Sequence, residues 1–255
     1  MTKLQILIDD KNSNPALECE HGFSVYVETP ALKFLFDCGQ TGAAFRNAQK
    51  LGVDLTKIRF AAISHAHYDH AGGFPELLKI VKLPYIYTGQ NFWQEKFSRA
   101  GETYEYKGAG FTFQDLARWR IEQRVCRDLV QLDDTAWLIG NFIRPYRVEI
   151  PARFVRGETK TPDNFDDEIS LVLREGDGVA LVVGCSHAGI LNIVATVQKR
   201  LDLPVKTILG GIHTDDMKIL ARLEDFGVER LALCHCSGDN LRADFVSTGS
   251  ILEVF

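Results

Sequence analysis

An apolar run at residues 59–64 leads directly into the hexapeptide His-Ala-His-Tyr-Asp-His at 65–70. The run does not alternate between apolar and polar residues, which predicts a strand covered on both faces, as in a layered fold. His65 and His67 are two residues apart, so at the end of a strand their side chains point the same way. Imidazoles and carboxylates are the ligands that a Zn²⁺-like ion prefers. The sequence therefore predicts a metal site at the end of a buried strand.

Four candidate ligands lie within this short hexapeptide: His65, His67, Asp69 and His70. A helical zinc motif would place two histidines four residues apart on one face, and this spacing fits a loop better. Such a loop cannot wrap all four groups around one ion without strain. We therefore expect two metal ions, one bound by His65 and His67 and the other by Asp69 and His70.

Three further histidines each follow an apolar strand and would complete such a site. They are His187, His213 and His235. The ends of neighbouring parallel strands meet at one edge of a sheet, which is where open α/β sheets place their sites. We expect His187 and His235 to bind metal. For His213, ligation and a role beside the metals are both open.

The other histidine and two cysteines near this region have weaker patterns. His21, before a glycine, is expected to be structural or to support a ligand. Cys234 and Cys236 flank His235, so in a continuous strand both would point away from its face. We expect them to be buried, inert thiols.

The order of predicted elements favours an α/β (α+β) fold. Both ends of the chain contain strands followed by helices, which suggests two similar halves packed sheet against sheet in a four-layer αββα sandwich, with residues 1–255 forming one domain. The middle, 88–160, is rich in aromatic residues and irregular. Two interpretations of it are open: an inserted cap over the site, or loops and hairpins with a small core of their own. Strands are predicted at 4–8, 23–28, 33–37, 59–64, 84–87, 169–173, 179–184, 205–209 and 230–234, and helices at 42–51, 74–81, 189–201 and 215–226.

The composition limits the classes of partner. The chain has 255 residues, a net charge of −5 and 45% hydrophobic residues, with no clustered basic stripe. This argues against nucleic-acid and membrane partners and favours a small-molecule substrate, and it leaves the oligomeric state open, a homo-oligomer included. The six cysteines show no disulfide spacing, and neither a signal peptide nor a membrane span is recognisable, so we expect a cytoplasmic protein.

The segment Ile-Ser-His-Ala-His-Tyr-Asp-His-Ala-Gly-Gly at 63–73 resembles the signature of the metallo-β-lactamase superfamily. The Asp-Cys-Gly at 37–39 resembles its Asp-Thr-Gly element, which implies that Asp37 supports the metal loop without binding metal. Three further elements, at 184–189, 210–213 and 234–238, resemble one subgroup. That subgroup includes the archaeal 7,8-dihydropterin-6-methyl-4-(β-D-ribofuranosyl)aminobenzene-5'-phosphate synthase.

The resemblance implies that the three histidines and the aspartate of the hexapeptide, together with His235, bind metal. The chain also departs from the family pattern. Many members have Gly-Asp where this chain has Gly184-Cys185, and that Asp bridges the two metals. Many also have a Gly-His-Thr ligand that is missing here, so His187 is the expected replacement. A hydroxide alone, Cys185, Asp166 or Asp167 would then serve as the bridge.

Three functions fit these residues. The first is hydrolysis of a small, phosphorylated or ring-containing substrate by a hydroxide bound to two divalent ions, with Zn expected and Mn or Fe as alternatives. Asp69 would orient the nucleophile, and His213 would donate a proton or hold a phosphate. The second is a synthase-type transfer that releases diphosphate. The third is a metal-binding or ligand-binding module without catalysis.

Overall fold

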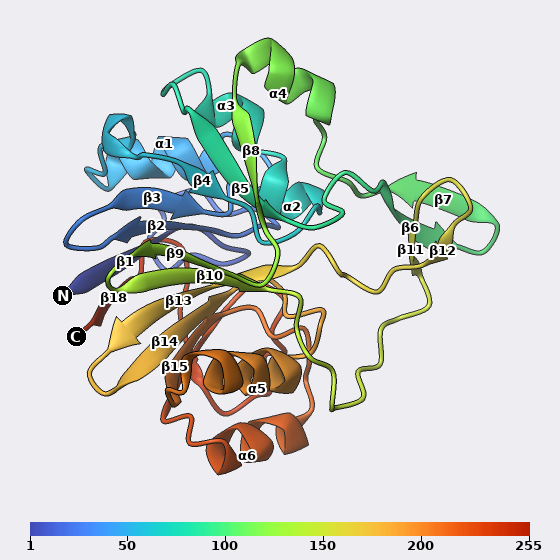
Figure 1. The fold of residues 1–255 in the computed structure, drawn as a ribbon. Helices are drawn as coiled ribbons and strands as arrows, with labels where there is room; N and C mark the ends of the chain where they lie inside the picture. Colours follow the sequence, from blue (N-terminus) through green and yellow to red (C-terminus); the bar gives the residue numbers. More distant parts are fainter.

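The computed structural model describes residues 1–255, and two seven-stranded sheets packed face to face form its centre (Figure 1). In the first sheet β3, β4, β5 and β8 run parallel to one another, while β1, β2 and β18 pair antiparallel. From edge to edge its strands are β18 (Ile251–Val254), β1 (Thr2–Ile8), β2 (Ser24–Glu28), β3 (Lys33–Phe36), β4 (Ala61–Ala62), β5 (Tyr85–Gly89) and β8 (Glu122–Cys126).

The second sheet has one parallel and one antiparallel half. The strands β14 to β17 are parallel, so their carboxyl ends meet at one edge, and β13, β10 and β9 continue antiparallel. From edge to edge its strands are β17 (Asp244–Phe245), β16 (Arg230–Leu233), β15 (Val205–Gly210), β14 (Gly178–Val183), β13 (Ile169–Glu175), β10 (Ala136–Gly140) and β9 (Leu129–Asp133).

Helices cover the outer face of each sheet. Above the first sheet lie α1 (Ala43–Lys50), α3 (Phe74–Leu77) and α4 (Phe113–Trp119), and below the second lie α5 (Ile190–Leu201) and α6 (Met217–Asp225) (Figure 1). One hydrophobic cluster fills the space between the sheets, and two others join each sheet to its helices. Burial of apolar area in these three clusters supplies most of the stabilisation. The predicted four-layer αββα sandwich is therefore confirmed.

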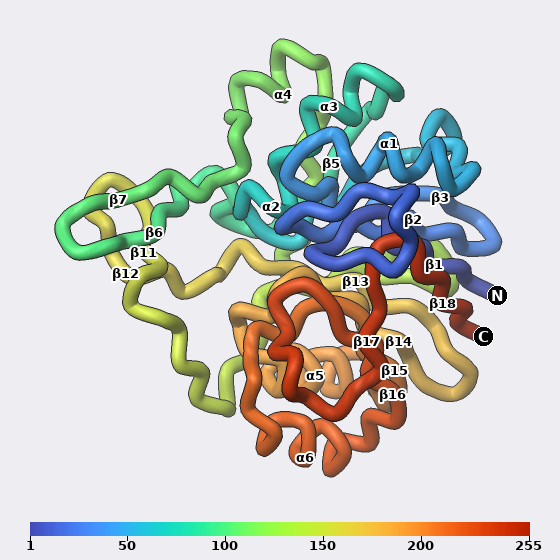
Figure 2. The backbone as a smooth tube through the Cα atoms, turned by 180° about the vertical axis from the view of Figure 1, so that it is seen from behind, coloured from blue at the N-terminus to red at the C-terminus, as the bar shows by residue number.

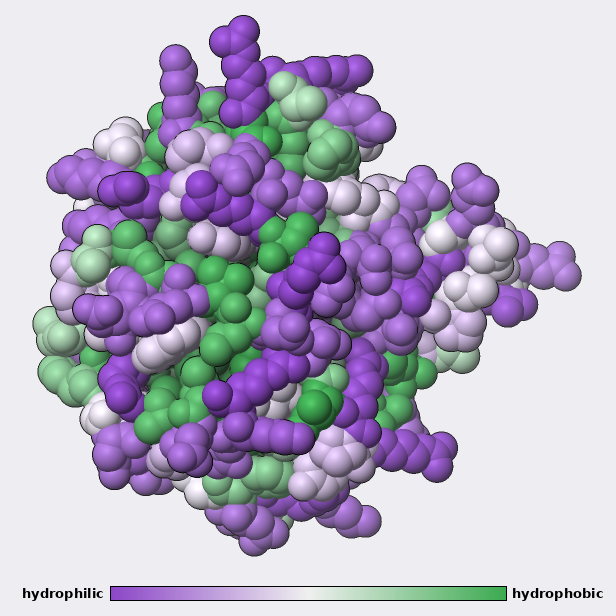
Figure 3. Space-filling view, viewed as in Figure 1, coloured by the Kyte–Doolittle hydropathy of each residue, from purple (hydrophilic) through white to green (hydrophobic).

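A third, four-stranded sheet projects from the sandwich, and we call it the arm. Its strands are β12 (Thr161–Pro162), β11 (Phe154–Arg156), β6 (Lys96–Ala100) and β7 (Thr103–Tyr106). Figure 1 shows it at the side of the molecule, and its visible surface is mainly hydrophilic (Figure 3). All four residues of β7 are exposed.

The boundaries 88–160 expected for an inserted segment do not match this unit. Within that range, β8 belongs to the first sheet and β9 and β10 to the second, while β12 of the arm lies beyond it. Three of its aromatic side chains are not over the site either: Phe92, Trp93 and Phe111 pack in the core of the first half. The irregular sequence concealed β8 and β9 because both are short and partly exposed.

Several predicted elements differ in length from the observed ones. The strand expected at 59–64 is regular only over β4, and the helix expected at 74–81 is the single turn α3. After β4 the chain leaves the sheet and leads into the short helix α2 (Tyr68–Ala71). A 3₁₀ turn at Leu55–Lys57 precedes β4. The pairing of β18 with β1 was not predicted and brings the two termini side by side (Figure 2). No helix has the length and apolar character needed to cross a bilayer.

Candidate metal centre

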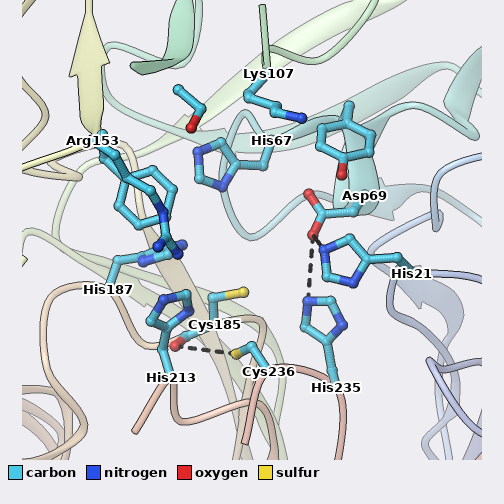
Figure 4. A pocket seen from close by; sticks show the side chains of 13 residues that line it. His21, His67, Asp69, Lys107, Arg153, Cys185, His187, His213, His235 and Cys236 are labelled. Carbon is cyan, nitrogen blue, oxygen red and sulfur yellow. Dashed lines mark hydrogen bonds and ion pairs between the residues drawn. The ribbon is translucent and has the colours of Figure 1, made fainter. Parts of the chain in front are cut away.

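A cavity of about 220 Å³ lies where the strand ends of both sheets meet the arm. The loops after β1, β4, β14, β15 and β16 contribute its histidines and cysteines, and the arm side contributes cations and an aromatic ring (Figure 4). The lining residues with titratable or metal-binding side chains are His21, His67, Tyr68, Asp69, Lys107, Arg153, Cys185, His187, His213, His235 and Cys236.

Asp37 fixes the histidine-rich loop, residues 64–70, through contacts at both of its ends. Its side chain is fully buried and accepts hydrogen bonds from the Ser64 backbone N–H at 2.6 Å and the Ser64 hydroxyl at 2.7 Å. It also contacts His70 Nδ1 at 2.7 Å. A carboxylate on Nδ1 orients the imidazole and leaves Nε2 facing the cavity, which is the usual support of a metal-binding histidine.

His70 is fully buried and its ring lies against that of His235, which lines the cavity. Their Nε2 atoms are 3.2 Å apart, and Nδ1 of His235 is 2.6 Å from Asp10 Oδ1. Asp69 Oδ2 lies 3.5 Å from His235 Nε2 and 3.7 Å from His70 Nε2. With both Nδ1 atoms held by carboxylates, a positive charge has to lie between the two Nε2 atoms, either a proton or a metal ion.

The charges around His235 favour that cation. Burial alone would lower the pKa of His235, but hydrogen bonds to Asp10 and Asp69 outweigh burial and raise its pKa well above the ordinary value. The same two carboxylates contact His21 at 2.8 Å and 3.2 Å and raise its pKa to about 9. His21 therefore supports Asp69 rather than lying apart from the site.

A second group of histidines is neutral and deeply buried. His65 Nε2 lies 3.0 Å from His67 Nδ1, and the His187 ring stacks on Phe165 with ring centres 3.8 Å apart. Burial lowers the pKa of His67 to about 3 and the pKa values of His65 and His187 well below the ordinary value. Neutral imidazole is the form that binds metal.

The donor atoms fit a metal ion by their positions. Nε2 of His187 and Nδ1 of His213 are buried without any hydrogen-bond partner, and an unpartnered buried donor or acceptor is costly. Two groups of donor atoms, each within 4.8 Å of one another, are His65, Cys185, His187 and His70, Cys185, His235. The residues present therefore suit a metal ion in each group.

The expectation that both cysteines flanking His235 point away from the cavity is wrong for Cys236. Strand β16 ends at Leu233 and His235 has a left-handed backbone, with φ of 52°, so the strand alternation does not continue. Cys236 lines the cavity and shares a donor group with Cys185 and His213. Cys234 is buried between the two sheets, as expected.

Asp166 and Asp167, considered as bridges between metals, are engaged elsewhere. Asp167 Oδ2 accepts the Ala66 backbone N–H at 2.9 Å, and its Oδ1 lies 2.6 Å from the buried Lys96 ammonium. Asp166 pairs with Arg156 at 2.6 Å. Asp167 therefore supports the histidine-rich loop, and neither carboxylate is available as a bridge.

Sequence reasoning missed three supporting groups: Asp10, Lys96 and Glu168. Glu168 is buried and accepts the backbone N–H groups of His187 at 2.8 Å and Ala188 at 2.6 Å. Burial raises the pKa of Glu168 to about 7. Asp10 lies two residues beyond an apolar strand, a position similar to that of the predicted ligands, and this was the available signal.

Comparison with known proteins identifies the family. The model of the metallo-beta-lactamase superfamily matches residues 17–235. An uncharacterized protein of Methanocaldococcus jannaschii is 24% identical over 242 residues, which cover 92% of this chain and 90% of that protein. The 7,8-dihydropterin-6-methyl-4-(beta-D-ribofuranosyl)-aminobenzene-5'-phosphate synthase of the same organism is 24% identical over 258 residues, covering 92% and 87%.

Solved structures give the same result for the fold. A metal-dependent hydrolase of the β-lactamase superfamily has a TM-score of 0.83 at 28% identity, with 100% of this chain and 99% of that chain covered. The short form of human tRNase Z has a TM-score of 0.60 at 15% identity, with 99% of each chain covered, and shares the fold. Since the family model spans most of the sequence and the resemblance drawn from the histidine motif is confirmed, the chain belongs to the metallo-β-lactamase superfamily.

Proposed function

We propose that this protein is a metal-dependent hydrolase that acts on a small, phosphorylated or ring-containing substrate. The observation that carries the proposal is the pair of donor groups at the cavity floor, in which the buried His187 Nε2 has no protein partner. The similarity to a metal-dependent hydrolase at 28% identity supports the same reaction class.

The residues that would hold two divalent ions divide into two sets. His65, His187 and the adjacent His67 form one, His70, His235 and the adjacent Asp69 form the other, and Cys185 lies close to both. When bound, two such ions lower the pKa of water and offset the negative charge that develops during attack. Zn²⁺ is the expected metal because imidazole and thiolate ligands suit it, with Fe and Mn as alternatives.

The remaining groups at the cavity bind and orient the substrate. Asp69 is 5% exposed and would orient the attacking water. His213, whose Nδ1 has no protein partner, would donate a proton to the leaving group or hold a phosphate oxygen. Lys107 and Arg153 bring positive charge to the arm side of the cavity and would bind an anionic group (Figure 4).

A synthase-type transfer with loss of diphosphate is the second candidate, and the 24% identity to the dihydropterin synthase favours it. The same cations would bind the diphosphate. Phe154 lines the cavity and would contact a ring system in either reaction. A binding module without catalysis is the third.

A substrate panel tests the proposed function. Purified protein is assayed with phosphodiesters, phosphomonoesters and lactones, and with a dihydropterin diphosphate supplied together with the aminobenzene riboside. We expect turnover of at least one hydrolytic substrate and its loss in His67→Ala. Turnover of the pterin pair alone would favour the synthase, and unchanged activity in His67→Ala would contradict both enzymatic functions.

Replacing Arg153 with alanine should raise KM for an anionic substrate by about tenfold or more, because a hydrogen bond to a charged group contributes about 1.5–3 kcal/mol. The effect on kcat should be small, since the group binds a part of the substrate that does not react. Arg99→Ala is the matched control, because Arg99 lies in the arm outside the cavity and donates to the Gly101 carbonyl. Equal KM values for the two variants would contradict this role.

A further inference from the structure

Cys185 lies at the floor of the cavity, two residues beyond the end of β14. Its side chain is buried, with 3% exposed, and its Sγ is 3.2 Å from His70 Nε2. Gly184 allows this position, because a Cβ there would lie 2.3 Å from Ser64 Oγ and 3.1 Å from Asp37 Oδ2. The backbone at Gly184 therefore packs directly against Ser64 and Asp37, which hold the histidine-rich loop.

The Cys185 sulfur belongs to both donor groups of the metal centre. One group is completed by His65 and His187, and the other by His70 and His235, so the sulfur is the one atom they share. His187, which is 5% exposed, belongs to the first group. Its Nε2 atom has no hydrogen-bond partner, which independently indicates that a metal ion binds there. The sulfur therefore lies between the two expected ion positions.

No carboxylate competes with Cys185 for this place. Asp37 is held by Ser64 and His70, Glu168 by two backbone N–H groups, and Asp167 by Ala66 and Lys96. Asp69 pairs with His21 and lies beside His70 and His235 only, so it would bind the second ion and does not reach the donor group of His65 and His187. We propose that the Cys185 thiolate bridges the two metal ions, an inference that rests on the proposed dinuclear centre.

The chemistry of sulfur is compatible with this role. A coordinating thiol loses its proton to the solvent when it binds a divalent ion, and the thiolate keeps lone pairs for two ions. Zinc–sulfur bonds of about 2.3 Å allow two ions on one sulfur to be about 3.5–4 Å apart, the usual spacing in two-metal sites. A bridging thiolate would also favour Zn²⁺, Fe²⁺ and Co²⁺ over Mg²⁺ and Mn²⁺.

Titration with Co²⁺ tests the bridge, because cobalt bound to thiolate has a sulfur-to-metal charge-transfer band in the near ultraviolet. The apo form of Cys236→Ser protein is used under anaerobic, reducing conditions, since Cys236 is the other sulfur that lines the cavity. We expect the band to grow through both of about two equivalents of bound cobalt. Growth that stops after the first equivalent would overturn the proposal.

Adding Cys185→Ser to that background should abolish the band while cobalt still binds, as measured by equilibrium dialysis. Cys234→Ser in the same background is the matched control, because Cys234 neighbours the site but is buried between the sheets, and it should keep the full band. Persistence of the band without Cys185 would overturn the bridge but leave the metal centre standing. Failure of the starting protein to bind any cobalt would overturn the metal centre itself, and the bridge with it.

Discussion

Replacing Lys96 with methionine should lower the free energy of unfolding by about 3–5 kcal/mol. The Lys96 ammonium is 1% exposed and lies 2.8 Å from Asp163 Oδ2 and 2.6 Å from Asp167 Oδ1. Methionine keeps most of the apolar stem but removes the cation, so two buried carboxylates would remain without their partner. Urea unfolding of the metal-free protein measures the effect.

Lys79→Met is the control for this substitution. Lys79 is also paired, at 2.6 Å from Glu76, but both side chains are exposed, and such a pair contributes less than about 1 kcal/mol. The Lys96→Met defect should also shrink as the pH falls. Burial raises the pKa of Asp167, and protonation in acid removes the uncompensated charge. Equal stability of the two variants at neutral pH would show that Lys96 is not needed to neutralise the two buried carboxylates.

The Lys96 substitution should also disturb the position of the histidine-rich loop. Lys96 holds Oδ1 of Asp167, while Oδ2 of the same carboxylate accepts the N–H of Ala66, which lies between His65 and His67. A side chain at the base of the arm is thereby connected to the hexapeptide through one carboxylate. We expect weaker metal binding in Lys96→Met even under conditions where the variant is folded.

Asp37→Asn should weaken metal binding by about 10–100-fold, the usual effect of removing a carboxylate that orients a metal-binding histidine. The carboxylate accepts from Ser64 N–H and Ser64 Oγ and holds His70 Nδ1, whereas an amide has one acceptor oxygen and would turn a donor toward one of these groups. Asparagine tolerates the left-handed backbone at this position, where φ is 62°, so the effect is chemical rather than conformational.

Competition with a chelator measures the affinity of the Asp37→Asn protein for Zn²⁺. Asp177→Asn is a suitable control, because Asp177 lies exposed in the turn after β13, where it pairs with Lys206, and should leave the affinity unchanged. An Asp37→Asn protein with the affinity of the control would show that the loop is fixed by other contacts.

The strands and helices that apolar patterns predicted are those buried in the sandwich. The runs that became β13, β14 and β15 have mainly apolar centres, and the burial of these centres on both faces follows from that. The arm and the edge strands β8 and β9 escaped prediction because half-exposed strands carry mixed residues. Pairing of β18 with β1 depends on contacts between the two ends of the chain, which a local pattern does not encode.

The sequence predicted the candidate ligands that are concentrated in one segment or follow a strand. It did not predict the residues that support them from distant parts of the sequence. The histidines of 65–70 and those after the strands of the second sheet lie around one cavity or in its floor, as their positions indicated. Cys236 was misplaced because the left-handed turn at His235 is a tertiary feature. Lys96 was missed because lysine is almost never fully buried unless it is paired, and its partners lie about seventy residues away in sequence.

The metal content of the purified protein shows whether the chain holds the proposed dinuclear centre. Protein prepared without chelators is analysed by mass spectrometry of its metals and by amino-acid analysis. We predict about two divalent ions per chain, with zinc predominant, and a clear reduction in His67→Ala. Wild-type protein that holds no more metal than His67→Ala, even after incubation with Zn²⁺, would contradict the dinuclear centre.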